Sequence, residues 1–268
     1  MTGHAPDPKV AVITGASSGI GAELATLFAR DGYQLLLVGR DREKLERVAA
    51  EARERSHAAA YTMVLDLAVP GSCAALEEEL TRRQLRPDVL VNNAGIALWG
   101  EFASLALADQ LQMVHLNVVA LTELTRRLLP AMLSRGRGRI LNVASTAAFQ
   151  PGPIMAVYYA SKAYVLSLSE ALANELERTG VTVTALCPGP TATQFQARAG
   201  IGGRSWLFQS HVMDAATVAR AGYDGMLRGR TVVIPGLRNR VFVFCVRLLP
   251  RDVVTRLVRT LQDTTSLH

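Results

Sequence analysis

The fold is decided by residues 14–21, which read Thr-Gly-Ala-Ser-Ser-Gly-Ile-Gly. This loop follows an apolar run at residues 10–13 that we expect to be a buried strand, and it opens a helical pattern that continues to Arg30. Glycines allow a tight turn and a close backbone approach to a pyrophosphate, and a helix N-terminus offers free N–H groups to that anion. A glycine turn can be purely structural, but its position between a strand and a helix favours a nucleotide site.

Short apolar runs alternate with helical patterns along the rest of the chain. Further strands are expected at residues 35–38, 61–65, 89–91, 139–143, 181–186 and 231–234, and helices at 19–30, 42–55, 73–83, 109–133, 157–178 and 215–227. Runs that are apolar throughout indicate burial on both faces of a sheet, with the helices as right-handed crossovers. We therefore predict an α/β fold, a Rossmann-type doubly wound parallel sheet of about seven strands in a single domain.

Composition excludes several functional classes. Formal net charge is +6, but the arginines are scattered and only 6% of residues are aromatic, so we expect no nucleic-acid partner. The cysteines, Cys73, Cys187 and Cys245, lie far apart without metal-ligand spacing. We therefore predict no metal site and a reducing, cytoplasmic location.

Four motifs in order along the chain carry a family resemblance: TGASSGIG at residues 14–21, NNAG at 92–95, YxASK at 158–162 and PG at 188–189. Over roughly Lys9 to Ile234 the chain resembles the short-chain dehydrogenase/reductase family. The resemblance implies a hydride transfer between NADP(H) or NAD(H) and a carbonyl or secondary alcohol. It also implies cofactor contacts by Gly15, Ser17, Ser18, Gly19, Ile20, Gly21, Asn93, Ala94, Gly95, Pro188, Gly189, Thr191 and Thr193.

The end of the second expected strand bears on the choice of cofactor. NAD-selective sites place an acid there to bind the ribose 2′-hydroxyl, but this chain has Gly39 at that position, followed by Arg40. A guanidinium fork suits a 2′-phosphate, so we predict NADP(H) in preference to NAD(H). The alternative is that Arg40 is an ordinary helix-start residue beside Asp41 as N-cap.

Two further positions have both a structural and a functional interpretation. Asp66 and Leu67 resemble the family pair that meets the adenine ring, although Asp66 could equally cap the end of its strand. Asn93 is expected to tie its loop to the sheet as well as to line the cofactor site.

Tyr158 and Lys162 lie four residues apart in a helical pattern and therefore share a face. A free tyrosine has a pKa near 10, and we expect the neighbouring ammonium to lower it so that Tyr158 can exchange a proton with the substrate oxygen. Tyr159 is the competing residue, because it stands three positions from Lys162, but the family pattern selects Tyr158.

Ser145 and Asn117 complete the expected catalytic set. Ser145 follows the fifth expected strand, and its hydroxyl can donate to the substrate oxygen where negative charge develops. Asn117 is a polar amide among apolar neighbours, and it matches the family asparagine that holds a water in a proton relay to the lysine.

We expect a substrate lid at residues 194–213, whose apolar side chains indicate an apolar carbonyl substrate, although the lid could instead pack on the core. Two alternatives to a carbonyl reductase are a non-catalytic NADP(H)-binding regulator and a membrane-surface reductase of lipid carbonyls. The family commonly forms homodimers or homotetramers through its long helices, and we expect the same here.

The ends of the chain differ in character. Residues 1–8 are expected to be a disordered tail, residues 9–236 the catalytic domain and residues 237–268 a basic amphipathic extension. In that extension Val253, Val254, Leu257, Val258 and Leu261 share a helical face, with Arg256 and Arg259 opposite. Such a helix can pack on the domain or a partner subunit, or lie peripherally on a membrane surface.

Overall fold

A computed structural model describes residues 8–56, 59–195, 199–200 and 212–262 of the chain. Seven parallel strands form one sheet in the order β3-β2-β1-β4-β5-β6-β9, which confirms the predicted fold class. The strands are β1 (Val10–Thr14), β2 (Gln34–Gly39), β3 (Ala60–Val64), β4 (Pro87–Asn92), β5 (Gly138–Val143), β6 (Val181–Leu186) and β9 (Val232–Val233). Strand order reverses between β1 and β4, and the crevice of such a sheet opens there, at the carboxyl ends of the strands.

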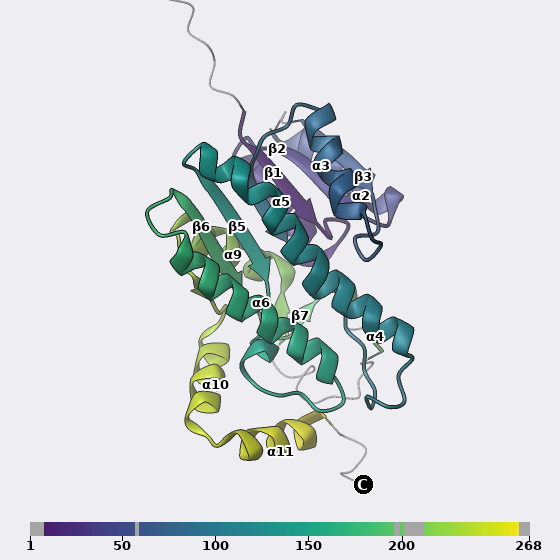
Figure 1. Ribbon diagram of the computed structural model, residues 1–268, viewed down its shortest axis with the longest axis vertical. Helices are drawn as coiled ribbons and strands as arrows, with labels where there is room; N and C mark the ends of the chain where they lie inside the picture. Colours follow the sequence, from purple (N-terminus) through teal and green to yellow (C-terminus); the bar gives the residue numbers. More distant parts are fainter. Residues whose placement is uncertain (1–7, 57–58, 196–198, 201–211, 263–268) are drawn as a thin grey trace, which may run out of the picture.

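Helices cover both faces of this sheet (Figure 1). One face packs on α1 (Gly19–Arg30), α2 (Arg42–Ser56) and α9 (Ala215–Leu227). The other packs on α3 (Ser72–Arg82), α5 (Leu121–Ser134) and α6 (Ala156–Glu175). Along β1 the side chains alternate between the layers: Ala11 and Ile13 face the first group of helices, and Val10 and Val12 the second. Burial on both faces explains why Val10 to Ile13 are all apolar.

The long helix expected at residues 109–133 is divided in the structure. α4 (Leu107–Val114) runs into a π-helical segment, η1 (His115–Ala120), and then into α5. A π turn accommodates an extra residue and often marks a functional site. Periodicity alone did not predict this segment. One extra residue in a turn shifts the positions of the following apolar residues too little to distinguish from an α-helical period.

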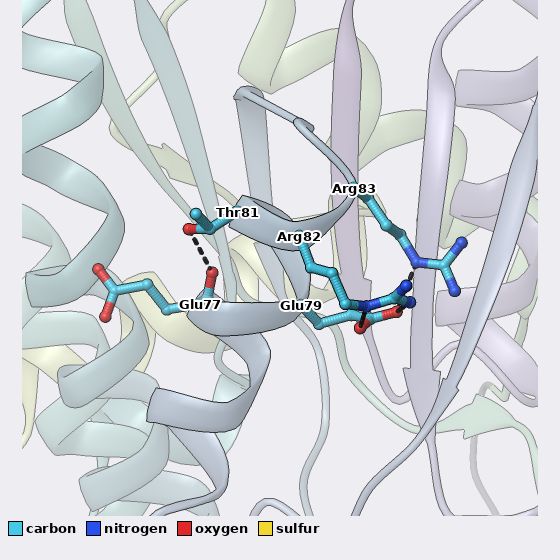
Figure 2. A network of polar contacts seen from close by, with 5 residues as sticks. All are labelled: Glu77, Glu79, Thr81, Arg82 and Arg83. Carbon is cyan, nitrogen blue, oxygen red and sulfur yellow. Dashed lines mark hydrogen bonds and ion pairs between the residues drawn. The ribbon is translucent and has the colours of Figure 1, made fainter.

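Short elements complete the framework. η2 (Thr146–Phe149) is a 3-10 turn after β5, and a small parallel pair joins β7 (Thr191–Ala192) to β8 (Met213–Asp214). At the end of α3, Glu79 accepts hydrogen bonds from Arg82 and Arg83, which hold the pKa of its carboxyl at about 2 (Figure 2). Arg83 also lies over the ring of Tyr61, so the end of α3 is attached to the edge strand β3.

The C-terminal extension forms two helices, α10 (Leu237–Leu248) and α11 (Arg251–Gln262), which lie beyond one end of the sheet (Figure 1). On α11, Val254 and Val258 are buried, so within the described residues this helix packs on its own domain. Val253 and Leu257, which we expected on the same face, are exposed. No helix in the described ranges is long and apolar enough to cross a membrane.

Candidate active site

A cleft of about 560 Å³ opens at the carboxyl ends of the strands, and most residues predicted from the sequence line it. The predicted residues along its walls are Gly15, Ser17, Ser18, Gly19, Ile20, Arg40, Asp66, Leu67, Asn93, Ala94, Gly95, Ser145, Tyr158, Lys162, Pro188, Gly189, Thr191 and Thr193. Gly21 and Asn117 lie behind the wall. The cleft therefore joins the glycine loop at one end to Tyr158 and Lys162 at the other.

The glycine loop has no room for side chains. Gly15 has a φ of 63° and Gly19 a φ of 59°, a conformation that favours glycine. A Cβ on Gly21 would lie 2.4 Å from the carbonyl oxygen of Gly15, so this glycine serves the packing of the loop on α1. A Cβ on Gly19 would lie 2.8 Å from Thr193, which brings the loop after β6 beside the start of α1.

Asn93 has the structural role that was expected as part of its function. Its amide nitrogen donates to the carbonyl oxygens of Thr14 at 2.9 Å and Gly15 at 3.0 Å. The hydroxyl of Thr14 in turn accepts from the backbone N–H groups of Asn93 and Ala94. These bonds fix the loop after β4 against the loop after β1.

Acidic groups near the end of β2 already have protein partners. Asp41 accepts from the backbone N–H of Lys44 at 3.1 Å and so caps α2, as the alternative interpretation of this segment proposed. Asp66 accepts from the backbone N–H of Ala68 at 3.0 Å, which is the capping interpretation of that residue. The Arg40 guanidinium lines the same end of the cleft, 3.7 Å from Asp66, with its side chain half-exposed.

At the other end of the cleft, Tyr158 and Lys162 project from α6 toward the carboxyl end of β5. Lys162 Nζ donates to the carbonyl oxygen of Val143 at 2.8 Å and lies 5.9 Å from the ring centroid of Tyr158. Ser145 caps η2, because its hydroxyl accepts from the N–H of Ala147 at 3.0 Å. Ser145 also interacts with the Tyr158 hydroxyl through its side chain, and all three residues line the cleft.

Burial controls the protonation of this group, and the expected lowering of the tyrosine pKa is not seen. Burial raises the pKa of Tyr158 to about 12, and the hydrogen bond with Ser145 offsets only part of that rise. Burial also lowers the pKa of Lys162 to about 8. Both charged forms lose hydration on burial, which is the largest cause of each shift.

Asn117 lies behind Gly95, and its side chain is fully used by the protein. The amide oxygen accepts from the N–H of Ile96 at 3.0 Å, and the amide nitrogen donates to the carbonyl of Ile96 and to Ser161. Asn117 lies within the π segment η1. The structure thus shows it anchoring the segment that follows Gly95 beside Lys162; its role in a proton relay stays a prediction.

Tyr159, the competing tyrosine, also reaches the cleft but its hydroxyl points to α11. Gln262 Nε2 donates to that hydroxyl at 2.6 Å, and Gln262 is fully buried. Val254 and Val258 of α11 belong to the same apolar cluster as Tyr158 and Tyr159. The C-terminal helix therefore packs against the end of the cleft that holds Tyr158 and Lys162, which we call the reacting end.

Several lining residues were not predicted from the sequence. Ile96 and Leu98, beside Phe195 of the expected lid, make the reacting end apolar, and Gln150 adds a buried amide oxygen that has no hydrogen-bond partner among the described residues. Their positions depend on how loops after different strands meet, which no local motif records. Of the expected lid, residues 196–198 and 201–211 lie outside the described residues.

The cleft meets the requirements of a dinucleotide site. Gly15 and Gly19 present bare backbone to the cleft, and Lys162 is a buried ammonium with no carboxylate within ion-pair distance among the described residues. The Val143 carbonyl accepts from this ammonium, and a bound ligand would supply partners for its other N–H donors. Fold and cleft together define a Rossmann-type nucleotide-dependent oxidoreductase.

The chain belongs to the short-chain dehydrogenase family, whose model matches residues 9–201. An uncharacterized oxidoreductase of Staphylococcus saprophyticus is 34% identical over 211 residues, which cover 79% of this chain and 90% of that protein. Members of this family bind nicotinamide cofactors and act on small molecules. The family model ends at residue 201, before α10 and α11 begin.

Solved structures agree with this assignment. A short-chain dehydrogenase from Sphingobium yanoikuyae in complex with NADPH is 38% identical, with a TM-score of 0.79 over 85% of this chain and 88% of that one. An alcohol dehydrogenase from Comamonas testosteroni, specific for bulky-bulky ketones, is 31% identical, with a TM-score of 0.75 over 90% and 92%. A similar protein from Burkholderia phymatum, 26% identical with a TM-score of 0.80 over 90% and 92%, was solved with NAD.

Proposed function

We propose that this oxidoreductase uses NADP(H) to interconvert an apolar carbonyl compound and its secondary alcohol, with Tyr158 as the proton donor. The observation that carries the proposal is the convergence of Tyr158, Ser145 and Lys162 at the apolar end of a cleft that begins at the glycine loop. Hydride chemistry comes from the nicotinamide when the cofactor is bound. The protein's own residues hold the substrate oxygen and move its proton.

A protonated Tyr158 is the form that a carbonyl reduction requires. With its pKa at about 12, Tyr158 carries its proton at neutral pH and can donate it to an oxygen that gains negative charge. We expect Ser145, whose hydroxyl donates to the Pro188 carbonyl at 3.4 Å, to turn to the same oxygen and donate a second hydrogen bond. Lys162, with a pKa of about 8, is still largely an ammonium at neutral pH and stabilises that charge.

Arg40 supports the choice of NADP(H). It lines the cleft at the end of β2, where Gly39 has no side chain and Asp41 is committed to capping α2. No carboxylate of β2 is therefore available there to bind a ribose 2′-hydroxyl, whereas a guanidinium can bind a 2′-phosphate.

Apolar walls at the reacting end favour an apolar substrate. Ile96, Leu98, Tyr159 and Phe195 surround the space beside Tyr158. Such walls exclude water and select a substrate body by its shape and its apolar area. The proposed substrate is thus a small molecule whose reducible carbonyl lies beside the Tyr158 hydroxyl.

The test compares two neighbouring tyrosines. Tyr158→Phe removes the donor, and we expect kcat for a panel of ketones and aldehydes, followed by NADPH absorbance, to fall by a factor on the order of 10²–10⁴. Tyr159→Phe removes the hydroxyl that Gln262 contacts and should retain most of the turnover. NADPH binding should persist in both variants.

Two results would contradict the proposal. Loss of turnover in Tyr159→Phe but not in Tyr158→Phe would show that Tyr159, and not Tyr158, donates the proton. Binding of NADPH without turnover of any carbonyl would instead indicate a regulator that senses the cofactor.

A further inference from the structure

Helix α10 is apolar on two opposite faces, and only one of them is covered by the domain. Its inner face is fixed: Val243 is buried, and Asn239 lies so close to Gly189 that a Cβ there would be 2.6 Å from the Asn239 side chain. Arg247 lies over the ring of Phe149, 5.6 Å from its centroid. The helix is therefore held against η2 and the loop after β6 in a single orientation.

The outer face of α10 carries a continuous apolar row, which we call the α10 stripe: Leu237, Val241, Phe244 and Leu248. Their exposed fractions are 75%, 53%, 63% and 69%. Steps of four, three and four residues place all four side chains on one side of a helix. Single exposed apolar residues are common on proteins, but a contiguous row marks a surface that contacts something.

The charges beside the stripe have one sign. Arg238, Arg240 and Arg247 are exposed on α10, and the helix contains no acidic residue. On a helix, Arg240 and Arg247 border one side of the stripe and Arg238 the other. From Leu237 to Gln262 the chain has six arginines and a single acid, Asp252.

We propose that the α10 stripe lies on the surface of an anionic lipid bilayer, with its apolar side chains at the acyl boundary and the flanking arginines on the lipid phosphates. This inference does not depend on the proposed reaction. It also moves the membrane-facing role from α11, whose Val254 and Val258 pack on the domain, to α10.

Charge argues against a second copy of the chain as the occupant. Two stripes facing each other across a two-fold axis would bring the same arginines together without an acid on either helix. An anionic surface complements those arginines and accepts the apolar row at the same time. Because α10 also contacts η2, part of the cleft wall, the bilayer would lie about one helix diameter, roughly 10 Å, from the reacting end.

The test is co-sedimentation of the full chain with two kinds of vesicle: phosphatidylcholine alone, and phosphatidylcholine mixed with phosphatidylglycerol. We expect binding to the mixed vesicles only, and weaker binding at high salt. Phe244→Glu should reduce the partition coefficient by about tenfold or more, because it puts a charge where an apolar side chain would enter the acyl boundary. Arg238→Gln should reduce it by about fivefold.

Val69→Glu is the matched control. Val69 is an exposed valine in the loop between β3 and α3, and its replacement changes the net charge as Phe244→Glu does. Val69→Glu should bind vesicles as the parent does, and thermal unfolding should show that Phe244→Glu is folded.

Three results would overturn the proposal: no vesicle binding by the parent protein, equal binding to both kinds of vesicle, or undiminished binding by Phe244→Glu. A different pair of results would show that a second copy covers the stripe. The parent protein would not bind vesicles, and Phe244→Glu would have a lower mass than the parent in sedimentation velocity.

Discussion

Lys162 is a charged group in a place that gives it little hydration, and this has a measurable consequence for stability. Burial lowers its pKa from 10.5 to about 8. Between these two pH values an unfolded chain keeps the proton that the folded chain has released, so the free energy of unfolding rises with pH in that window. Below pH 8 both states are protonated and the full cost of the buried ammonium is present.

We therefore predict that the parent protein gains up to about 3 kcal/mol of stability, relative to Lys162→Met, as the pH rises from 8 to 10.5. Urea denaturation at several pH values measures the difference. Lys9→Met, at an exposed lysine, is the control and should give a profile parallel to the parent's. A Lys162→Met profile that also stays parallel would mean that the ammonium is hydrated in solution.

Arg40 yields a prediction on cofactor selectivity. Arg40→Ala removes the guanidinium at the end of β2, and the affinity for NADPH should fall by about tenfold to a hundredfold, the value of a charge-assisted hydrogen bond. The affinity for NADH should hardly change, because it has no 2′-phosphate. Fluorescence titration measures both, with Arg42→Ala as a neighbouring exposed control. Equal losses for the two cofactors would refute the assignment.

At this scale, sequence motifs predicted the positions of the side chains better than their environment. The spacing of Tyr158 and Lys162 correctly places both side chains at one end of the cleft. It did not predict the pKa of Tyr158, because desolvation depends on Phe195 and on α11, which are remote in the chain. Gln150 was missed for the same reason: a lone glutamine carries no motif, and only the assembled cleft shows its unpartnered oxygen.

At the scale of elements, the apolar runs predicted all seven strands of the main sheet, since burial on both faces leaves a clear pattern. The helices of the C-terminal extension were harder. α10 contains the β-branched and aromatic run Val241 to Val246, which does not show a helical period because both of its faces are apolar. On α11 the period was clear, but it could not show which of the adjacent valines would face the domain.

The buried face of α11 can be tested against its exposed face. Val254→Ala with Val258→Ala removes methyl groups from the cluster that supports Tyr158 and Tyr159, and should lower the free energy of unfolding by about 3–5 kcal/mol. The KM for carbonyl substrates should rise, while the Kd for NADPH stays constant because the glycine loop lies at the far end of the cleft.

The exposed pair on the same helix, Val253→Ala with Leu257→Ala, is the matched control. Neither residue is buried, so the loss of stability should remain below about 1 kcal/mol. Chemical denaturation and steady-state kinetics distinguish the two pairs. Similar losses for both would show that α11 is not a fixed part of the active-site wall.

At the scale of the whole molecule, two of the exposed apolar surfaces formed by the described residues differ in charge. The α10 stripe is flanked by arginines alone. The second surface, the α5–α6 groove, is lined by Val118, Val119, Thr122, Glu123, Arg126, Arg127 and Tyr164. It contains both signs of charge, and the hydroxyls of Thr122 and Tyr164 join its two walls at 2.9 Å. α5 and α6 lie side by side on one face of the sheet (Figure 1).

A groove with both signs of charge can pair with itself, because an acid on one copy can meet an arginine on the other across a two-fold axis. The homo-oligomer implied by the family resemblance would use these long helices, so we expect a second copy of this chain to cover the α5–α6 groove. Sedimentation velocity should give the parent at least twice the monomer mass of 28.9 kDa.

Val119→Glu places a charge at the exposed apolar centre of the groove and should shift the protein toward the monomer. Phe244→Glu, on the α10 stripe, should leave the mass unchanged, so the same two variants separate self-association from lipid binding. A monomeric parent, or a Val119→Glu variant of undiminished mass, would assign the groove no partner of this kind.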